Sequence, residues 1–115
     1  LRYQIGQQYA AHEDYFDPKL YGHQSTNRAV TAFYYLNDVE EGGETWFPRA
    51  DGQPPRFDYT SCKGGFAAKP VKGSLVVFYD MSPSGQLDPY SLHGGCPPRS
   101  NTKWAGTVWF RVPTP

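Results

Sequence analysis

The chain has 115 residues, which is enough for one domain with one modest core and leaves no room for a separate cofactor domain. Its 11 basic residues (Lys and Arg) balance its 11 acidic residues (Asp and Glu), so the sequence has no excess of positive charge for binding nucleic acid. No run of about 20 apolar residues is present to cross a membrane. We therefore expect neither a nucleic-acid partner nor a membrane segment.

The first residues, Leu1 to Ile5, have the pattern of the middle of a strand and follow no leader sequence. We therefore expect residues 1–115 to be a fragment of a longer protein that lacks the elements normally preceding it.

The composition predicts an all-β domain. Tyr, Phe and Trp make up 17% of the residues, Gly and Pro are frequent, and no long stretch shows the helical period of 3.6 residues. The expected strands are Arg2–Asp14, Arg28–Leu36, Thr45–Phe47, Ala67–Val71, Ser74–Tyr79, Tyr90–Gly94 and Lys103–Val112.

The first expected strand ends in His12-Glu13-Asp14. Side chains at positions i and i+2 of a strand point to the same face, so the imidazole of His12 and the carboxylate of Asp14 can share one metal ion. The spacing also occurs by chance, in which case these are two polar residues on a surface strand.

Two long segments, Asp17–Thr26 and Arg49–Gly65, read as loops without helical pattern and are candidate lids beside a site. We expect His23, in the first of these loops, to be a solvated bystander. The apolar, β-branched run Leu75–Tyr79 has the profile of a buried strand and indicates packing.

His93 is the expected third metal ligand. Two histidines and one carboxylate on one face of a metal leave the opposite face open, as in non-heme Fe(II) oxygenases. Ten residues further on, Lys103 offers a cation that can hold a dicarboxylate. The alternative is a lysine on the outer face of its strand, next to Trp104.

Two cysteines, Cys62 and Cys96, allow one disulfide, and the alternative is two free thiols. Cys96 follows His93 by three residues, on a segment that must hold its geometry. A bridge there adds roughly 3–4 kcal/mol by loop entropy and implies a secretory compartment.

About seven short strands, with ligands on an early and a late strand, fit a jelly roll, or double-stranded β-helix. In that fold the two strands lie near each other inside the barrel. The long separation between Asp14 and His93 in the sequence is then a consequence of topology.

Six motifs, in order, resemble the catalytic core of prolyl 4-hydroxylases in the 2-oxoglutarate and Fe(II)-dependent oxygenase superfamily. They are Tyr3–Tyr9, His12–Phe16, Tyr35–Thr45, Lys69–Gly73, Ser91–Pro97 and Lys103–Trp104. The resemblance is nearest to the plant and algal type acting on proline-rich proteins, which is similar to the catalytic end of collagen prolyl hydroxylases. One departure is Arg99–Thr102, where the family often has a glycine two residues before the lysine.

The resemblance implies Fe(II) bound by His12, Asp14 and His93, with 2-oxoglutarate as cosubstrate, ascorbate as cofactor, and a location in the endoplasmic reticulum. The implied reaction hydroxylates peptidyl proline and releases succinate and CO₂. Lys103 is the implied partner of the far carboxylate of 2-oxoglutarate, and two hydroxyls, those of Tyr3 and Thr45, match further cosubstrate contacts.

A proline-rich peptide is the implied substrate, and Tyr9, Arg28 and Trp109 match the substrate groove of the family. Two other functions stay open. One is a non-catalytic jelly-roll module that binds proline-rich chains through its aromatic side chains. The other is a related oxygenase acting on lysine or on a small molecule.

Overall fold

A computed structural model describes residues 1–56 and 58–114, and in this part of the chain two four-stranded antiparallel sheets face each other. In chain order the elements are β1 (Arg2–Tyr3), β2 (Tyr9–His12), α1 (Pro18–Tyr21), β3 (Thr26–Tyr35), β4 (Thr45–Phe47), η1 (Ala50–Gly52), β5 (Phe66–Ala68), β6 (Leu75–Tyr79), η2 (Pro89–Ser91), β7 (His93–Gly95) and β8 (Lys103–Pro113). The two sheets have the strand orders β1-β8-β3-β6 and β2-β7-β4-β5.

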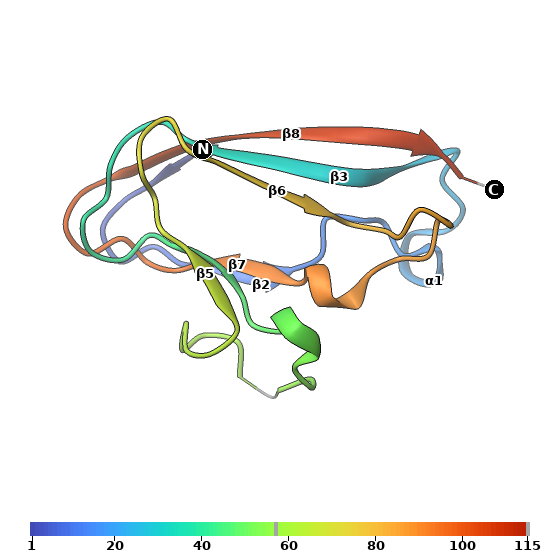
Figure 1. Ribbon diagram of the computed structural model, residues 1–115, viewed down its shortest axis with the longest axis horizontal. Coiled ribbons are helices and arrows are strands. Elements are labelled where there is room, and N and C mark those ends of the chain that lie inside the picture. Colours follow the sequence, from blue (N-terminus) through green and yellow to red (C-terminus); the bar gives the residue numbers. More distant parts are fainter. Residues whose placement is uncertain (57, 115) are drawn as a thin grey trace.

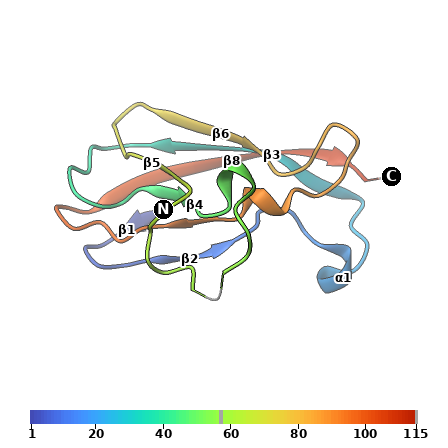
Figure 2. The same cartoon turned by 60° about the horizontal axis from the view of Figure 1, so that its bottom comes forward.

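The predicted all-β jelly roll is confirmed. Figure 1 shows the two sheets as layers, with β8, β3 and β6 in one layer and β2, β7 and β5 in the other. Neighbouring strands come from distant parts of the sequence, so that β2 pairs with β7 and β1 with β8. Figure 2, turned by 60°, shows the chain running along β1 toward one end of the molecule, turning there and returning along β2.

The prediction of one strand over Arg2–Asp14 is wrong. The chain forms β1 in the first sheet, turns at Gly6, and enters the second sheet as β2. Gly6 has a φ of 86°, a conformation that glycine adopts without strain, and its N–H donates to the carbonyl of Pro98 at 2.9 Å. Asp14 lies beyond the end of β2, in a bend, so strand alternation does not explain its orientation.

Strands β3 and β8 form the centre of the first sheet and pair over nearly their whole length. They match the predicted strands Arg28–Leu36 and Lys103–Val112 within two residues. Residues from β3, β4 and β8 form the core between the sheets, and Tyr35, Trp46 and Ala105 are each only 1% exposed.

The segment Leu75–Tyr79 forms β6, but the prediction that it is wholly buried is wrong. Leu75, Val77 and Tyr79 are exposed, whereas Val76 and Phe78 are half-buried. This alternation arises because β6 is an edge strand of a sheet that has only one face against the core.

The segment Asp17–Thr26 contains one helical turn, which the sequence reading missed. In α1 the carboxylate of Asp17 accepts a hydrogen bond from the N–H of Lys19 at 2.9 Å, and Pro18 opens the helix. A single turn is too short to show a helical period, which is why it escaped prediction.

Two other predicted boundaries also change. The expected strand Tyr90–Gly94 begins as the 3₁₀ turn η2, capped by Asp88, and becomes a strand only at β7. The expected strand Ala67–Val71 is shorter and forms β5. In the expected loop Arg49–Gly65 the described residues include the turn η1, and Phe57 lies outside the described residues.

Among residues 1–56 and 58–114, no helix has the length and apolar character needed to cross a membrane.

Candidate active site

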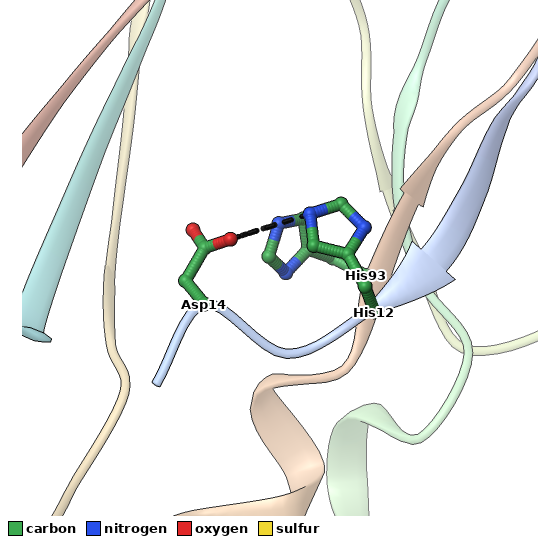
Figure 3. Close-up of side chains that lie close together, drawn as sticks. All are labelled: His12, Asp14 and His93. Atoms are coloured by element: carbon green, nitrogen blue, oxygen red, sulfur yellow. Dashed lines mark ion pairs between the residues drawn. The ribbon is translucent and has the colours of Figure 1, made fainter. Parts of the chain in front are cut away.

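Three side chains, those of His12, Asp14 and His93, converge between the sheets (Figure 3). His12 ends β2 and His93 begins β7, and the pairing of these strands places the two residues opposite each other. The Oδ1 atom of Asp14 lies 3.3 Å from Nε2 of His12 and 3.5 Å from Nε2 of His93. The three potential ligand atoms lie within 4.8 Å of one another, which fits a single metal ion.

The backbone fixes the orientation of both imidazole rings. Nδ1 of His12 lies 2.8 Å from the carbonyl oxygen of Ala10, and Nδ1 of His93 lies 2.8 Å from the carbonyl oxygen of Ser91. Because a carbonyl only accepts, each Nδ1 carries the hydrogen and donates it. Nε2 of each neutral ring is then free to bind a metal, as is usual for metal-binding histidines.

The electrostatics of the three groups follow from their burial and from one another. Burial lowers the pKa of His93, against the opposing effect of Asp14. Burial also disfavours charged His12, but hydrogen bonds to Asp14 and Ala10 outweigh this effect and raise the pKa of His12. Burial alone would raise the pKa of Asp14, yet hydrogen bonds and the nearby imidazoles lower it to about 2. Asp14 is therefore a carboxylate at neutral pH, as a metal ligand must be.

The second oxygen of Asp14 is held by the protein. Oδ2 accepts hydrogen bonds from the hydroxyl of Thr31 at 2.8 Å and from the indole N–H of Trp109 at 3.2 Å. The sequence reading did not select Thr31, although it is a hydroxyl in an otherwise apolar part of β3. The two oxygens of one carboxylate thus have different surroundings.

Lys103 lies inside the fold and not on the outer face of its strand. It is 1% exposed, and Nζ lies 4.9 Å from the ring centroid of Tyr3 and 5.3 Å from that of Phe33. Burial lowers the pKa of Lys103 to about 8, with Glu44 opposing the shift. No ion pair of Lys103 occurs among residues 1–56 and 58–114. A buried ammonium without a counter-ion suits an incoming carboxylate.

Thr45 and Tyr3 line the same cavity as this lysine. The strand register pairs Tyr3 directly with Lys103. Thr45 is 3% exposed, and its hydroxyl lies 2.6 Å from the hydroxyl of Tyr35, which donates to the carbonyl of Ala68 at 3.1 Å. Because the Tyr35 hydroxyl donates its hydrogen to Ala68, the Thr45 hydroxyl donates to Tyr35, and this hydrogen bond fixes the Thr45 rotamer.

One cavity of about 100 Å³ joins the predicted metal ligands to the predicted cosubstrate residues. Its lining includes all six of them, namely His12, Asp14, His93, Tyr3, Thr45 and Lys103. A larger cavity of about 790 Å³ lies elsewhere, against Met81 and Pro113, and none of its described lining residues is a carboxylate or a lysine. His23 lines that second cavity and is exposed, away from the metal ligands, as predicted. The smaller cavity is therefore the chemical site.

Two of the three predicted substrate residues, Tyr9 and Trp109, line the smaller cavity, and Arg28 contacts Trp109 without lining it. Tyr9 is 45% exposed and its ring centroid lies 4.6 Å from that of His12. Arg28 lies between two aromatic rings, with its guanidinium carbon 3.7 Å from the centroid of Trp109 and 4.9 Å from that of Phe16. Trp109 thus has two sets of contacts, since its N–H also binds Asp14.

The predicted disulfide between Cys62 and Cys96 is present. It joins the segment before β5 to the residue immediately after β7, the strand that starts with His93. Cys96 is 3% exposed, and its N–H donates to the carbonyl of Glu44 at 2.9 Å. The bond therefore anchors the strand that carries one of the candidate ligands.

Comparisons with known proteins agree with this geometry. Probable prolyl 4-hydroxylase 9 of Arabidopsis thaliana is 46% identical over 113 residues, which are 96% of this chain and 39% of that protein. Prolyl 4-hydroxylase 13 of the same plant is 44% identical over 116 residues, covering 99% of this chain and 42% of that protein. The chain thus spans about two fifths of the length of these relatives.

Solved structures with the same fold include the viral collagen prolyl hydroxylase of Paramecium Bursaria Chlorella virus-1 in its 2OG complex. It matches with a TM-score of 0.74 and 31% identity, over 98% of this chain and 56% of that one. A Pseudomonas putida prolyl-4-hydroxylase matches with a TM-score of 0.60 and 27% identity, over 96% of this chain and 49% of that one.

The family model described as "2OG-Fe(II) oxygenase superfamily" matches residues 1–111, nearly the whole chain. The donor set of His12, Asp14 and His93 is the two-histidine, one-carboxylate set that non-heme Fe(II) oxygenases use. The chain belongs to the 2OG-Fe(II) oxygenase superfamily.

Proposed function

We propose that the protein is a prolyl 4-hydroxylase, which uses Fe(II), dioxygen and 2-oxoglutarate to hydroxylate peptidyl proline and releases succinate and CO₂. One observation carries the proposal: the His12–Asp14–His93 cluster and the buried ammonium of Lys103 line the same cavity. A metal-binding triad alone is compatible with many chemistries. A triad that shares its cavity with a buried cation, one without an ion pair in the described part of the chain, suits a cosubstrate that binds the metal at one end and offers a carboxylate at the other.

The roles of the metal ligands follow from the contacts. His12 and His93 would bind Fe(II) through Nε2, and Asp14 would bind it through Oδ1. Bound Fe(II) supplies the redox chemistry by which the superfamily couples dioxygen to decarboxylation of 2-oxoglutarate. The chain itself supplies orientation, since both Nδ1 atoms are held by backbone carbonyls.

The far carboxylate of 2-oxoglutarate would accept hydrogen bonds from the Lys103 ammonium and from the hydroxyl of Tyr3. Thr45 would join them by redirecting to the carboxylate the hydrogen that it donates to Tyr35 in the cosubstrate-free site. A charge-assisted hydrogen bond is about twice as strong as a neutral one. Binding of the carboxylate would also offset the cost of burying the ammonium. Lys103 therefore favours a dicarboxylic cosubstrate over a neutral one.

The peptide would dock at the mouth of the cavity. Proline-rich chains adopt an extended polyproline II helix, whose carbonyls stay free and whose rings pack on aromatic side chains. Tyr9 and Trp109 offer partly exposed aromatic rings there, and Arg28 offers guanidinium donors held in place by Trp109 and Phe16. The relatives named prolyl 4-hydroxylase support proline as the target.

The proposal includes ascorbate as a cofactor and a location in the endoplasmic reticulum lumen. The Cys62–Cys96 disulfide supports an oxidising compartment, because structural disulfides are rare in the reducing cytosol. Ascorbate rests on the resemblance to prolyl 4-hydroxylases, and its test is dependence of sustained turnover on added ascorbate.

The test of the proposed function is a turnover assay with Fe(II), 2-oxoglutarate and ascorbate on three substrates: a proline-rich peptide, a collagen-like peptide and a lysine-containing peptide without proline. We expect a mass gain of about 16 Da, one oxygen atom, on the proline peptides with equimolar succinate. A mass gain on the lysine peptide alone would assign a different oxygenase. Peptide binding without succinate production would assign a non-catalytic binding module.

A further inference from the structure

The hydroxyl of Thr31 lies between two buried carboxyl groups. Its Oγ1 atom is 2.8 Å from Oδ2 of Asp14 and 2.7 Å from Oδ2 of Asp80. A hydroxyl has one hydrogen and can donate it to only one of these oxygens. The other contact needs a hydrogen that comes from a carboxyl group. One of the two carboxyl groups, that of Asp14 or that of Asp80, is therefore protonated.

The surroundings of the two carboxyl groups indicate which one carries that proton. Asp14 accepts a hydrogen bond from the indole of Trp109 and faces Nε2 of two histidines, where a proton or a metal ion compensates its charge. Asp80 is 0% exposed, and its Oδ1 atom has no hydrogen-bond partner within residues 1–56 and 58–114. A buried, half-satisfied carboxylate is costly, and the cost falls when the group is protonated.

The charges around Asp80 agree with this assignment. Burial raises its pKa to about 6, the negative charges of Asp14 and Asp88 add to the shift, and the Thr31 hydrogen bond and Arg28 oppose it. The hydrogen bonds then run in one direction. Asp80 donates to Thr31, and Thr31 donates to Asp14.

Because Thr31 donates to Asp14, the two oxygens of Asp14 have different partners. Oδ2 is occupied by two donors, Thr31 and Trp109, while Oδ1 faces both imidazoles (Figure 3). A carboxylate held in this way can offer one oxygen to a metal ion. Without the donors it is free to rotate and bind through both.

We propose that Thr31, backed by protonated Asp80, is a positioning residue that makes Asp14 a one-oxygen metal ligand. The proposal rests on the metal site of the proposed function but not on its peptide substrate. A carboxylate that binds through one oxygen would leave more of the metal open to cosubstrate and dioxygen than one that binds through both. Hydrogen-bonded partners of metal ligands typically change metal affinity by about 10–100-fold when they are removed.

The experiment measures Co(II) binding to the intact protein without 2-oxoglutarate or dioxygen, by titration and by the visible absorption of bound Co(II). Thr31→Val keeps the shape of the side chain and removes the donor. We expect about a 10–100-fold loss of Co(II) affinity and a changed absorption spectrum, because the coordination number changes. Thr31→Ser keeps the hydroxyl and should restore both. Thr26→Val is the matched control, since Thr26 lies on the same strand and its hydroxyl contacts Arg111.

Asp80 variants test the direction of the hydrogen bonds and provide a second probe if Thr31→Val does not fold. In Asp80→Asn the amide can donate to Thr31 as a protonated carboxyl does, so Co(II) affinity should stay within about threefold of wild type. Asp80→Leu cannot donate and should weaken binding as Thr31→Val does. If Asp80→Asn and Asp80→Leu weaken Co(II) binding equally, the assignment of the proton to Asp80 is overturned.

Folded Thr31→Val with wild-type Co(II) affinity and spectrum would overturn the positioning role while leaving the proposed function intact. A wild-type protein that binds no Co(II) would instead remove the metal site itself, and with it both proposals. Thermal melting of each variant establishes that the compared proteins are folded.

Discussion

Tyr3 and Lys103 are direct partners in the antiparallel pairing of β1 and β8, so their side chains leave the sheet on the same face. The ammonium of Lys103 lies 4.9 Å from the ring centroid of Tyr3. Two residues at opposite ends of the chain are thereby brought together in one cavity, where we propose that the far carboxylate of 2-oxoglutarate binds.

Lys103→Ala should raise the KM for 2-oxoglutarate much more than the KM for peptide. The lost interaction is a hydrogen bond to a charged group, worth on the order of 1.5–3 kcal/mol, or about 10–150-fold in affinity. Steady-state kinetics with each substrate varied in turn measures the effect. Lys72→Ala is the matched control, because Lys72 is an exposed lysine outside the cavity lining. An unchanged KM for 2-oxoglutarate would place Lys103 outside the cosubstrate site.

The KM for 2-oxoglutarate should also increase as pH rises through about 8. The pKa of Lys103 in the cosubstrate-free protein is lowered by burial to about 8, so above that pH a growing fraction of the lysine is neutral and binds carboxylate less well. Lys103→Arg should bind 2-oxoglutarate less tightly overall, since the guanidinium has a different shape, but it should lose this pH dependence because arginine stays charged. A wild-type KM that is flat from pH 7 to 9.5 would contradict the prediction.

Single substitutions His12→Ala, Asp14→Ala and His93→Ala should each abolish hydroxylation while the fold persists. Each removes one of three ligands from a site that has no spare ligand among the described residues. Succinate release measures activity, and circular dichroism measures the fold. Asp14→Gly should still bind some metal without regaining hydroxylation. Near-normal turnover by any of the alanine variants would show that the triad is wrongly assigned.

Cys62→Ser/Cys96→Ser should lower the free energy of unfolding by about 3–4 kcal/mol, the loop-entropy value for a bridge of this span. The two cysteines are separated by 34 residues in the sequence. The variant should also bind iron less tightly, because Cys96 anchors the end of the strand that starts with His93. Denaturant unfolding and iron titration check the two effects. Equal stability of wild type and variant under non-reducing conditions would remove the structural role of the bond.

Asp80 should make the metal-free protein less stable as pH rises from about 4 to about 7. Its pKa is 3.8 in the unfolded chain and about 6 in the fold, so the folded state binds more protons in this window. Its contribution is fully present below about pH 4 and is lost as pH rises through 6, with a limit on the order of 3 kcal/mol. Urea unfolding of wild type and Asp80→Asn at pH 4.5 and 7.5 isolates this contribution. The free energy of unfolding should fall less between the two pH values in the variant than in wild type. An equal fall in both proteins would refute the assignment.

Much of the site could be predicted because its chemistry is visible in short motifs. His12, Asp14, His93 and Lys103 all line one cavity, and Cys62 and Cys96 are joined by a disulfide. The strand alternation predicted to orient Asp14 is nevertheless wrong, because Asp14 lies in a bend beyond the end of β2. A local period cannot reveal a bend whose shape depends on contacts with another strand.

Thr31 and Asp80 could not be predicted, because neither belongs to a motif and their contact joins residues 49 positions apart in the sequence. The sequence features that could have drawn attention to them are a hydroxyl within the apolar part of β3 and an acidic residue directly after the apolar strand β6. Such signals are common at strand ends and on sheet faces. Only the pairing of β3 with β6 gives them meaning.

The division of the first residues between the two sheets has a consequence for folding. The partners of β1 and β2 are β8 and β7, and the Asp14–Trp109 hydrogen bond spans 95 residues of sequence. Such non-local pairing folds slowly, since long loops must close before contacts form. Of the three candidate ligands, only His12 and Asp14 are neighbours in an unfolded chain, so tight binding waits for β2 to meet β7. Metal should therefore bind the native state selectively and act as a ligand that stabilises it, raising the melting temperature with its concentration.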